Sequence, residues 1–477
     1  MKQQFKIFGF LVYAFIIITP CALAQLPGRA PDVLPGTIPE MRDPSFWIAR
    51  MEKPDEIILP ISEIQSMNKA YRKKIQAPDP FKDVKEERKS KLLHYFPGIA
   101  LIVPDLESLK PEAVSDSVKE KITVEIEYLR KSEYGNSNDV KYAGWEIDEL
   151  EKEMAYDRVK DKIAVRNGIA VRTTRLKNVP AFSPERIGMT KSGSRSRWDL
   201  WSIGVLKIGK PVKVLHSSLS GEFVFVLCEI GWGWVRSDDI AFGKKEEIDN
   251  FVNDEEFVVC TGDRVLFYSD ESCTYASGWF RMADRLPLVS RNNPRLVKAP
   301  VRKMNGEFAT ETAWLAGDAD VHVGLLPYTR RNIVETALKL LDNPYDFTGT
   351  FFGRQHETTY RDIFGCFGFD LPYHGGLFTH CGTNEEVLPP EIGSEEQYRR
   401  ILEHEPFTTI MITLQDRGGH AQLLIGEYNG VPIVFDQHGY SYKDEEGNDL
   451  IIRRCCIDEI TMPAYFLKRK LTFLELK

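Results

Sequence analysis

The sequence predicts a multidomain α+β protein with a helical N-terminal domain, two small β-barrels and a C-terminal α+β domain. The first observation is length, since 477 residues exceed what one hydrophobic core usually supports. The second is the spacing of apolar residues, which is helical before Asn167, alternates in short runs after it, and becomes helical again from Leu325. The third is composition, because 43% hydrophobic and 28% charged residues are ordinary values for a globular protein.

The first residues have the pattern of a secretory signal peptide, which we expect to span residues 1–24. Lys2 and Lys6 precede an apolar run over residues 7–18. Ala22-Leu23-Ala24 then has the pattern of a cleavage site. The run is shorter than the roughly 20 residues that a membrane-spanning helix needs. Cys21 would allow a lipoprotein signal, but the proline before it disfavours that alternative. We therefore expect export to the periplasm or the cell exterior, without membrane insertion after cleavage.

Residues 25–162 are predicted to form the N-terminal helical domain. A stretch rich in proline and glycine, 25–45, indicates a linker or an extended arm. Helical spacing of apolar residues then recurs in three segments. The first begins near Ser62, and the other two are Pro111–Leu129 and Asp148–Lys162. These segments indicate a support for the domains that follow.

Two runs of short β-branched segments with glycine turns predict two β-barrels, at residues 163–250 and 251–318. In the first run, inward and outward residues alternate over two hairpins, and Gly231 and Gly233 flank Trp232. The second run begins near Phe257 and repeats the pattern. Composition alone does not indicate what either barrel binds.

Residues 319–477 are predicted to form an α+β domain, with helices first and an antiparallel sheet afterwards. Thr329 is placed to cap a helix that ends at Asn343-Pro344. A second helix is expected from about His356 to Phe367. Three β segments follow, and a hairpin turn at Asn429-Gly430 joins the last two.

Charge and cysteine spacing exclude several functions. A net charge of -8 gives no basic surface, so we expect no nucleic-acid binding. Loss of the signal peptide leaves seven of the eight cysteines (8 − 1 = 7), and an odd number cannot all pair. Cys260 and Cys273 are close enough in sequence to form a disulfide, whereas Cys455 and Cys456 are expected on two faces of one strand. No histidine or cysteine has the spacing of a zinc site, so neither a metal nor a cofactor is predicted.

His420 is the residue that the pattern best places for catalysis. It opens a predicted strand, and the hairpin brings Asp436-Gln437-His438, at the end of the next strand, beside it. Any one of these three could orient the His420 ring, and a register shift of one residue changes which side chain faces it. A cysteine thiolate at a helix N-terminus would complete a catalytic arrangement of this kind.

The order of these segments resembles the NlpC family of cell-wall cysteine peptidases, in members that carry an N-terminal stabilising domain and two bacterial Src-homology-3 barrels. The resemblance covers nearly the whole mature chain and is carried by SFWIARMEKPDEIILP, NGIAVRTTRLKNVP, GWGWVRSDDIAF, TGDRVLFYSDESCTYASGWFRMADRLPL, GLLPYTRRNIVETALKLLDNPYDF and GGHAQLLIGEYNG. It implies a papain-like C-terminal domain with His420 as the catalytic histidine and one of Asp436, Gln437 and His438 as its partner. The implied activity is cleavage of peptidoglycan stem peptides between D-glutamate and the diamino acid.

The nucleophile position departs from the family. The family has Asp-Cys-Ser before a helix that ends in Phe-Gly-x-x-Leu-Pro, and this chain aligns with that pattern without a gap. Gln355, His356 and Glu357 then stand at the three positions, so His356 replaces the nucleophile. The family's Trp-Gly-Gly turn reads Phe347-Thr348-Gly349. The predicted substrate-binding residues are therefore Phe347, Gln355 and Glu357.

The resemblance leaves three hypotheses open. The first is a degenerate peptidase that binds peptidoglycan stem peptides or muropeptides. The second is an active hydrolase with His420 as the base and a displaced nucleophile. Cys381 lies in a loop that could approach the site, whereas Cys366, ten residues along the helix and roughly 15 Å from His356, is interpreted as a core residue. The third is a scaffolding protein of the envelope, for which the sequence offers no positive sign. The oligomeric state does not follow from the sequence.

Overall fold

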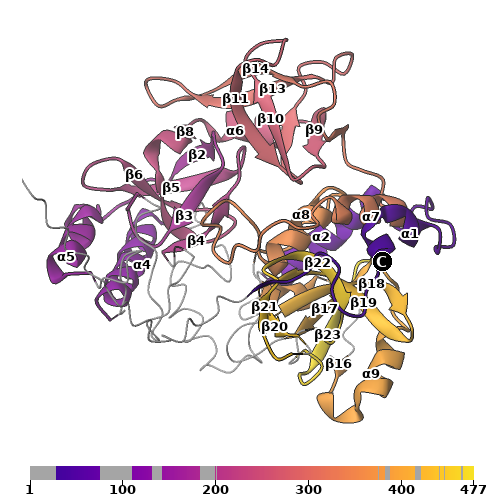
Figure 1. Cartoon of the computed structure of the whole chain (residues 1–477). Helices are drawn as coiled ribbons and strands as arrows, with labels where there is room; N and C mark the ends of the chain where they lie inside the picture. Colours follow the sequence, from indigo (N-terminus) through magenta and orange to yellow (C-terminus); the bar gives the residue numbers. More distant parts are fainter. Residues whose placement is uncertain are drawn as a thin grey trace, which may run out of the picture.

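The computed structural model of the chain describes residues 28–75, 110–131, 142–182, 199, 201–373, 375–381, 387–413, 420–439, 441–444, 446–462 and 466–477. The predicted signal peptide, 1–24, lies outside these residues. Figure 1 shows one group of elements from residues 111–242, a second from 257–323, and a third in which residues 28–75 accompany residues 330–475. None of the described helices could cross a bilayer, because each is too short or too polar.

The first described segment packs against the C-terminal domain. It contains four short elements: β1 (Gly28–Arg29), the 3-10 helix η1 (Pro39–Arg42), α1 (Pro44–Ile48) and α2 (Ile61–Ile75). Met41, Trp47 and Ile64 of this segment are buried in the core of the C-terminal domain. Residues 25–162 were predicted to form one helical domain. In the part that the structure describes, they divide between two cores, because the helices after residue 110 pack against the first β unit and not against the C-terminal domain.

The helices α4 (Pro111–Lys131) and α5 (Gly144–Glu153), followed by the 3-10 helix η3 (Tyr156–Arg158), cover the first β unit. One face of α4 is apolar, and Val118 and Ile122 bury that face beside Trp201 and Trp234 of the sheet. Glu125 is the exception on this face. Its carboxylate is buried and accepts a hydrogen bond of 3.2 Å from the Trp234 indole.

Replacing Glu125 with glutamine is expected to stabilise the protein near pH 8. Burial raises the pKa of Glu125 well above its ordinary value, more than Trp234 and Lys121 lower it. The proton is thus bound more tightly in the folded state, so the stabilising effect of protonation is complete below about pH 4 and is lost as the pH rises. Glutamine keeps an acceptor for Trp234 and does not ionise. Thermal unfolding should show a gain of at least about 1 kcal/mol near pH 8, the equivalent of one pKa unit, that shrinks toward about pH 4; an equal gain at both pH values would contradict the assignment.

The first β unit is a seven-stranded sheet of order β4-β3-β7-β6-β5-β2-β8, in which neighbouring strands are antiparallel. Its alternating β-branched and aromatic residues bury one face under α4 and the other within the sheet's own core. The strands are β2 (Arg166–Ala170), β3 (Thr174–Lys177), β4 (Ser202–Leu206), β5 (Pro211–Ser217), β6 (Phe223–Leu227), β7 (Trp232–Arg236) and β8 (Ile240–Phe242), with the 3-10 helix η4 (Ser237–Asp239) before β8.

The second β unit has two small sheets around one core, with strand orders β11-β10-β14-β13 and β12-β9-β15. It extends to Val323, five residues past the predicted boundary at 318 (323 − 318 = 5), because β15 pairs with β9. Its elements are α6 (Lys245–Val252), β9 (Phe257–Cys260), β10 (Arg264–Tyr268), β11 (Ala276–Arg281), β12 (Arg285–Pro287), β13 (Leu296–Arg302), β14 (Phe308–Leu315) and β15 (Val321–Val323).

The C-terminal domain packs two helices on one face of an antiparallel six-stranded sheet of order β16-β23-β17-β18-β19-β22. The helices are α7 (Arg330–Leu338) and α8 (His356–Gly365), and α9 (Ser394–Ile401) covers the opposite face. The strands are β16 (Val387–Leu388), β17 (Thr409–Thr413), β18 (His420–Tyr428), β19 (Val431–His438), β22 (Arg454–Glu459) and β23 (Leu471–Glu475). The hairpin β20 (Ser441–Lys443) and β21 (Asp449–Ile451) pairs with β1, and the 3-10 helices are η5 (Gly375–His380) and η6 (Pro390–Ile392).

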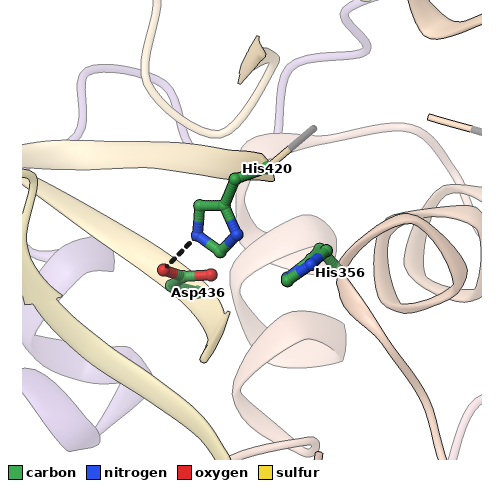
Figure 2. Close-up of side chains that lie close together, drawn as sticks. All are labelled: His356, His420 and Asp436. Atoms are coloured by element: carbon green, nitrogen blue, oxygen red, sulfur yellow. Dashed lines mark hydrogen bonds and ion pairs between the residues drawn. The ribbon is translucent and has the colours of Figure 1, made fainter. Parts of the chain in front are cut away.

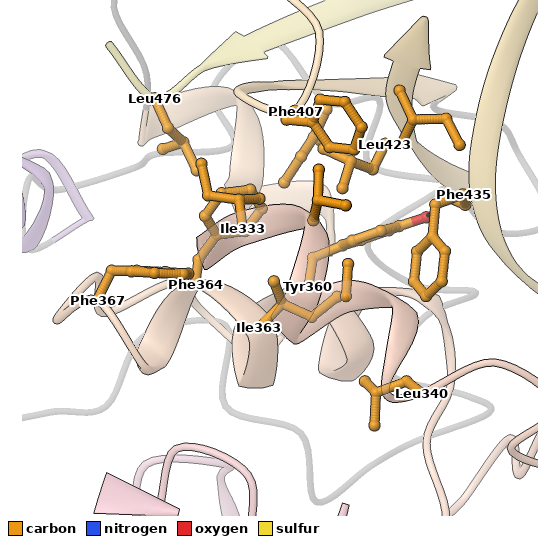
Figure 3. Close-up of a cluster of buried hydrophobic side chains, with 14 of the residues drawn as sticks. Ile333, Leu340, Tyr360, Ile363, Phe364, Phe367, Phe407, Leu423, Phe435 and Leu476 are labelled. Carbon is orange, nitrogen blue, oxygen red and sulfur yellow. Dashed lines mark hydrogen bonds between the residues drawn. The ribbon is translucent and has the colours of Figure 1, made fainter. Parts of the chain in front are cut away.

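The core between the helices and the sheet fixes where α8 lies. Tyr360, Ile363 and Phe364 of α8 belong to one fully buried cluster with Leu423 and Phe435 of the sheet, and Tyr360 reaches toward Phe435 (Figure 3). Thr329 caps α7 as predicted, because its side chain accepts a hydrogen bond from the Asn332 backbone. Both helices expected from the sequence are therefore present in this domain, but α7 ends at Leu338 and not at the predicted Asn343-Pro344.

Candidate functional site

The N-terminus of α8 carries His356. Gln355 is the extended residue before the helix, and its backbone N–H donates to the Thr358 hydroxyl over 2.9 Å. His356 is 5% exposed, and its Nδ1 lies 3.0 Å from the backbone oxygen of Gln437. A carbonyl oxygen can only accept, so Nδ1 carries the hydrogen and Nε2 carries a lone pair. Burial and, to a smaller extent, the neighbouring His420 together lower the pKa of His356 to about 4, so His356 is neutral at physiological pH.

The β18–β19 hairpin places His420 and Asp436 together. Its turn is at Asn429-Gly430, both with positive φ, as predicted from that dipeptide. His420 Nε2 lies 2.8 Å from Asp436 Oδ2, and the Gln422 amide donates to the same oxygen over 3.0 Å. Of the three partners considered for His420, Asp436 is therefore the one that binds its ring. Burial alone would raise the pKa of Asp436, but His420 lowers it to about 2 and keeps it ionised.

The Tyr360 hydroxyl joins α8 to both strands of this hairpin. It lies 3.0 Å from the backbone oxygen of Ala421 and 2.9 Å from that of Phe435. These two residues are the immediate neighbours of His420 and Asp436 along their strands. Tyr360 thus fixes the distance between the helix that carries His356 and the strands that carry the other two side chains.

His356 and His420 face each other at the centre of the site. Their ring centroids are 4.3 Å apart and the rings are nearly perpendicular, at 79° (Figure 2). Tyr345 lies against His356 at 5.3 Å, and Phe466 lies against His420 at 5.7 Å. His420 is 1% and Asp436 0% exposed, so aromatic walls shield the cluster from water.

The remaining predicted site residues lie around this cluster. The His438 ring is 6.3 Å from His420 and 3.9 Å from Asp458 Oδ2, which makes it a neighbour of the pair. Phe347 and Gln355 line a cavity of about 10 Å³ between α8 and the first β unit, room for about one water. Glu357 lies beside Gly375, where an added Cβ would be 2.4 Å from its side chain. Phe347 and Gln355 therefore share one small cavity, and Glu357 is not among the residues that line it.

No cysteine replaces the nucleophile in this cluster within the described residues. Cys366 lies at the far end of α8, with its sulfur 3.4 Å from Cys260 O, and burial raises its pKa to about 12. Cys381 is half-buried, with its sulfur 3.5 Å from Leu377 O. Cys456 pairs with Asp436 across β19 and β22, but burial and the nearby Asp458 and Asp436 raise its pKa well above that of a free thiol.

The seven cysteines among the described residues are all free thiols. Cys260 is buried in β9, while Cys273 is half-buried in the turn after β10. The disulfide suggested by the spacing of these two residues is therefore absent, and that interpretation was wrong. Cys455 and Cys456 alternate across β22 as expected, because neighbouring strand residues point to opposite faces.

The sequence missed a buried ionic cluster behind α8. The Asp362 carboxylate binds Lys207 over 2.6 Å, Arg281 over 3.0 Å and Arg354 over 2.7 Å. Lys207 comes from the first β unit and Arg281 from the second, so the cluster ties both units to α8. Arg354 also pairs with Asp263. The sequence does not predict this cluster, because most of the partners are far apart along the chain and only the fold brings them together.

Comparisons with known proteins agree with this architecture. A family model of the SH3 domain (SH3b1 type) matches residues 188–236, within the first β unit. No curated protein matches the chain. The structure is similar to that of an NlpC/P60 endopeptidase from Photobacterium damselae subsp. piscicida, with a TM-score of 0.67 and 15% identity over 90% of this chain and 96% of that chain. This chain has the NlpC/P60 fold.

Two further solved structures are less similar to this chain. They are NlpC1 and NlpC2 from Trichomonas vaginalis, with 10% and 9% identity over 65% and 62% of this chain and 92% and 96% of theirs. Their TM-scores of 0.25 and 0.22 are too low to show a shared fold. The predicted resemblance to the NlpC family with an SH3b domain is confirmed, whereas the second barrel at 251–318 stays a prediction.

Proposed function

We propose that this protein is an exported peptidoglycan-binding protein of NlpC/P60 fold that recognises stem peptides and lacks cysteine-peptidase activity. The observation that carries the proposal is His356 at the N-terminus of α8, facing the His420–Asp436 pair. In a cysteine peptidase that position needs a thiolate, which the helix dipole and a neighbouring histidine stabilise. A buried neutral imidazole is a much weaker nucleophile toward an amide carbonyl.

The SH3b1-type domain and the fold support the cell wall as the target. We extend the proposal to the predicted organisation: a signal peptide over 1–24, helical support over 25–162, SH3-like barrels at 163–250 and 251–318, and the peptidase-like domain over 319–477. Within that domain we assign His420 and Asp436, with His438 beside them, as the retained pair, and Phe347, Gln355 and Glu357 as contacts for the stem peptide.

Purified protein incubated with muropeptides should bind them and leave them intact. Binding is measured by calorimetry, and the stem peptides are then analysed by mass spectrometry for cleavage between D-glutamate and the diamino acid. His322→Ala is a matched control, because His322 lies on β15 outside the cluster.

Two results would contradict the proposal. Cleavage that persists in His322→Ala and disappears in His420→Ala would show an active hydrolase with a displaced nucleophile. Absence of both binding and cleavage would favour a scaffolding role instead.

A further inference from the structure

Three potential metal ligands from three separate elements meet at the centre of the site. They are His356 at the start of α8, His420 at the start of β18 and Asp436 on β19 (Figure 2). One donor atom from each lies within 4.8 Å of the other two, and all three side chains are buried. The spacing of histidines and cysteines in the sequence predicted no metal site, because these donors are brought together only by the fold.

The hydrogen bonds around the two imidazoles leave a lone pair on each. His356 donates from Nδ1 to the Gln437 carbonyl, which leaves the lone pair on Nε2. His420 donates from Nε2 to the ionised Asp436 carboxylate, which leaves the lone pair on Nδ1. Metal-binding histidines have this arrangement, in which the second ring nitrogen is held by a carbonyl or a carboxylate.

Asp436 supplies the independent observation that points to a ligand. The residue is 0% exposed, and its Oδ1 has no hydrogen-bond partner among the described residues. Figure 2 shows this second carboxylate oxygen turned to the side where His356 lies. A buried carboxylate oxygen without a partner is costly, and a bound cation would remove that cost.

We propose that His356, His420 and Asp436 bind one divalent transition-metal ion, with Zn²⁺ as the best fit. Two imidazoles and a carboxylate suit zinc, which takes nitrogen and oxygen ligands at about 2.0–2.2 Å, whereas Mg²⁺ and Ca²⁺ prefer oxygen ligands alone. Small side-chain rotations close the present spacing onto one ion. The substitution of histidine at the nucleophile position thus converts a site for a thiolate into a site for a metal.

A second donor group lies directly beside the first. Asp436, His438 and Asp458 also bring one donor atom each within 4.8 Å of one another, so Asp436 belongs to both groups. We assign the ion to the first group because it offers two imidazoles and the second offers one. The assignment does not rest on muropeptide binding, and a chain that fails to bind peptide would still bind the ion.

The test uses the untagged mature chain, stripped with a chelator and then titrated with Zn²⁺ or Co²⁺. Calorimetry and elemental analysis after gel filtration should give about one ion per chain. The Co²⁺ complex should show the visible absorption of a nitrogen- and oxygen-ligated ion. His356→Ala, His420→Ala and Asp436→Asn should each weaken Zn²⁺ binding by about 100-fold or more, since even an outer partner of a ligand contributes about 10–100-fold.

Matched variants locate the ion. His322→Ala and Asp458→Asn should bind Zn²⁺ as the wild type does, and circular dichroism of each variant confirms folding. Failure of the wild-type chain to bind Zn²⁺ or Co²⁺ stoichiometrically would overturn the proposal. So would wild-type affinity in both His356→Ala and His420→Ala, or loss of binding in Asp458→Asn with binding retained in His356→Ala. The wild-type titration needs no variant to fold.

Discussion

Replacing Asp362 with alanine is expected to lower the stability of the protein by about 3–5 kcal/mol, the cost of leaving buried charges without their partner. The carboxylate is 2% exposed and binds Lys207, Arg281 and Arg354, which are themselves buried. Without it, Lys207 keeps only Asp284 and Arg354 keeps only Asp263 as an ion-pair partner among the described residues, and Arg281 loses the Asp362 carboxylate. Urea unfolding of the wild type and of Asp362→Ala measures the difference.

The acid dependence of the same variant gives a second readout. Burial would raise the pKa of Asp362, but Lys207, Arg281 and Arg354 hold it below its ordinary value. A depressed pKa in the folded state contributes stability above the unfolded pKa of about 3.9, and this contribution is lost as the pH falls. The difference between wild type and Asp362→Ala should therefore shrink below about pH 4.

Asp249→Ala is the matched control for this prediction. Asp249 pairs with Lys245 over 2.6 Å on the surface of α6, and both side chains are about half exposed. An exposed pair of this spacing contributes about 0.3–0.5 kcal/mol. Equal losses in Asp249→Ala and Asp362→Ala would show that the buried cluster contributes no more than a surface pair.

Local signals predicted the elements of the C-terminal domain. Thr329 caps α7 because its hydroxyl satisfies a free backbone N–H, and Asn429-Gly430 forms the hairpin because both residues tolerate positive φ. Which surface a helix covers is not a local property. The apolar residues of 28–75 and of α4 have the same helical spacing, yet the first group joins the C-terminal core and the second joins the first β unit.

The sequence predicted the site only in part. It placed His356 at the start of a helix and His420 beside residues 436–438. It could not choose Asp436 from that group, because a β-bulge between Leu424 and Gly426 shifts the register of β18 against β19. Gly426 has a φ of 152° there, and a Cβ would lie 2.8 Å from the Trp47 ring. Trp47, which is far away along the chain, therefore packs against the strand at the bulge. The bulge sets the register that places Asp436 beside His420.

Replacing His356 with cysteine is expected to create cysteine-peptidase activity toward muropeptides, about 100-fold or more above the wild-type level, the usual contribution of a positioned general base. The new thiol would stand at the N-terminus of α8, where the helix dipole favours the thiolate, and beside His420, which Asp436 orients. The measurement is stem-peptide cleavage by mass spectrometry in the presence of a chelator, so that a metal ion bound at the same position does not mask the thiol.

Two controls separate this gain from a general change in the fold. His356→Ala opens the same space without a nucleophile and should not cleave, and His356→Cys combined with His420→Ala should lose the gain because the base is missing. Alkylation by iodoacetamide, mapped to position 356, shows whether the new thiol is more reactive than the seven native cysteines of the described residues, which are buried or half-buried. A variant that is alkylated but neither cleaves nor binds muropeptide would show that the scaffold keeps the catalytic pair and has lost the peptide site, and stem-peptide recognition would then have to be abandoned.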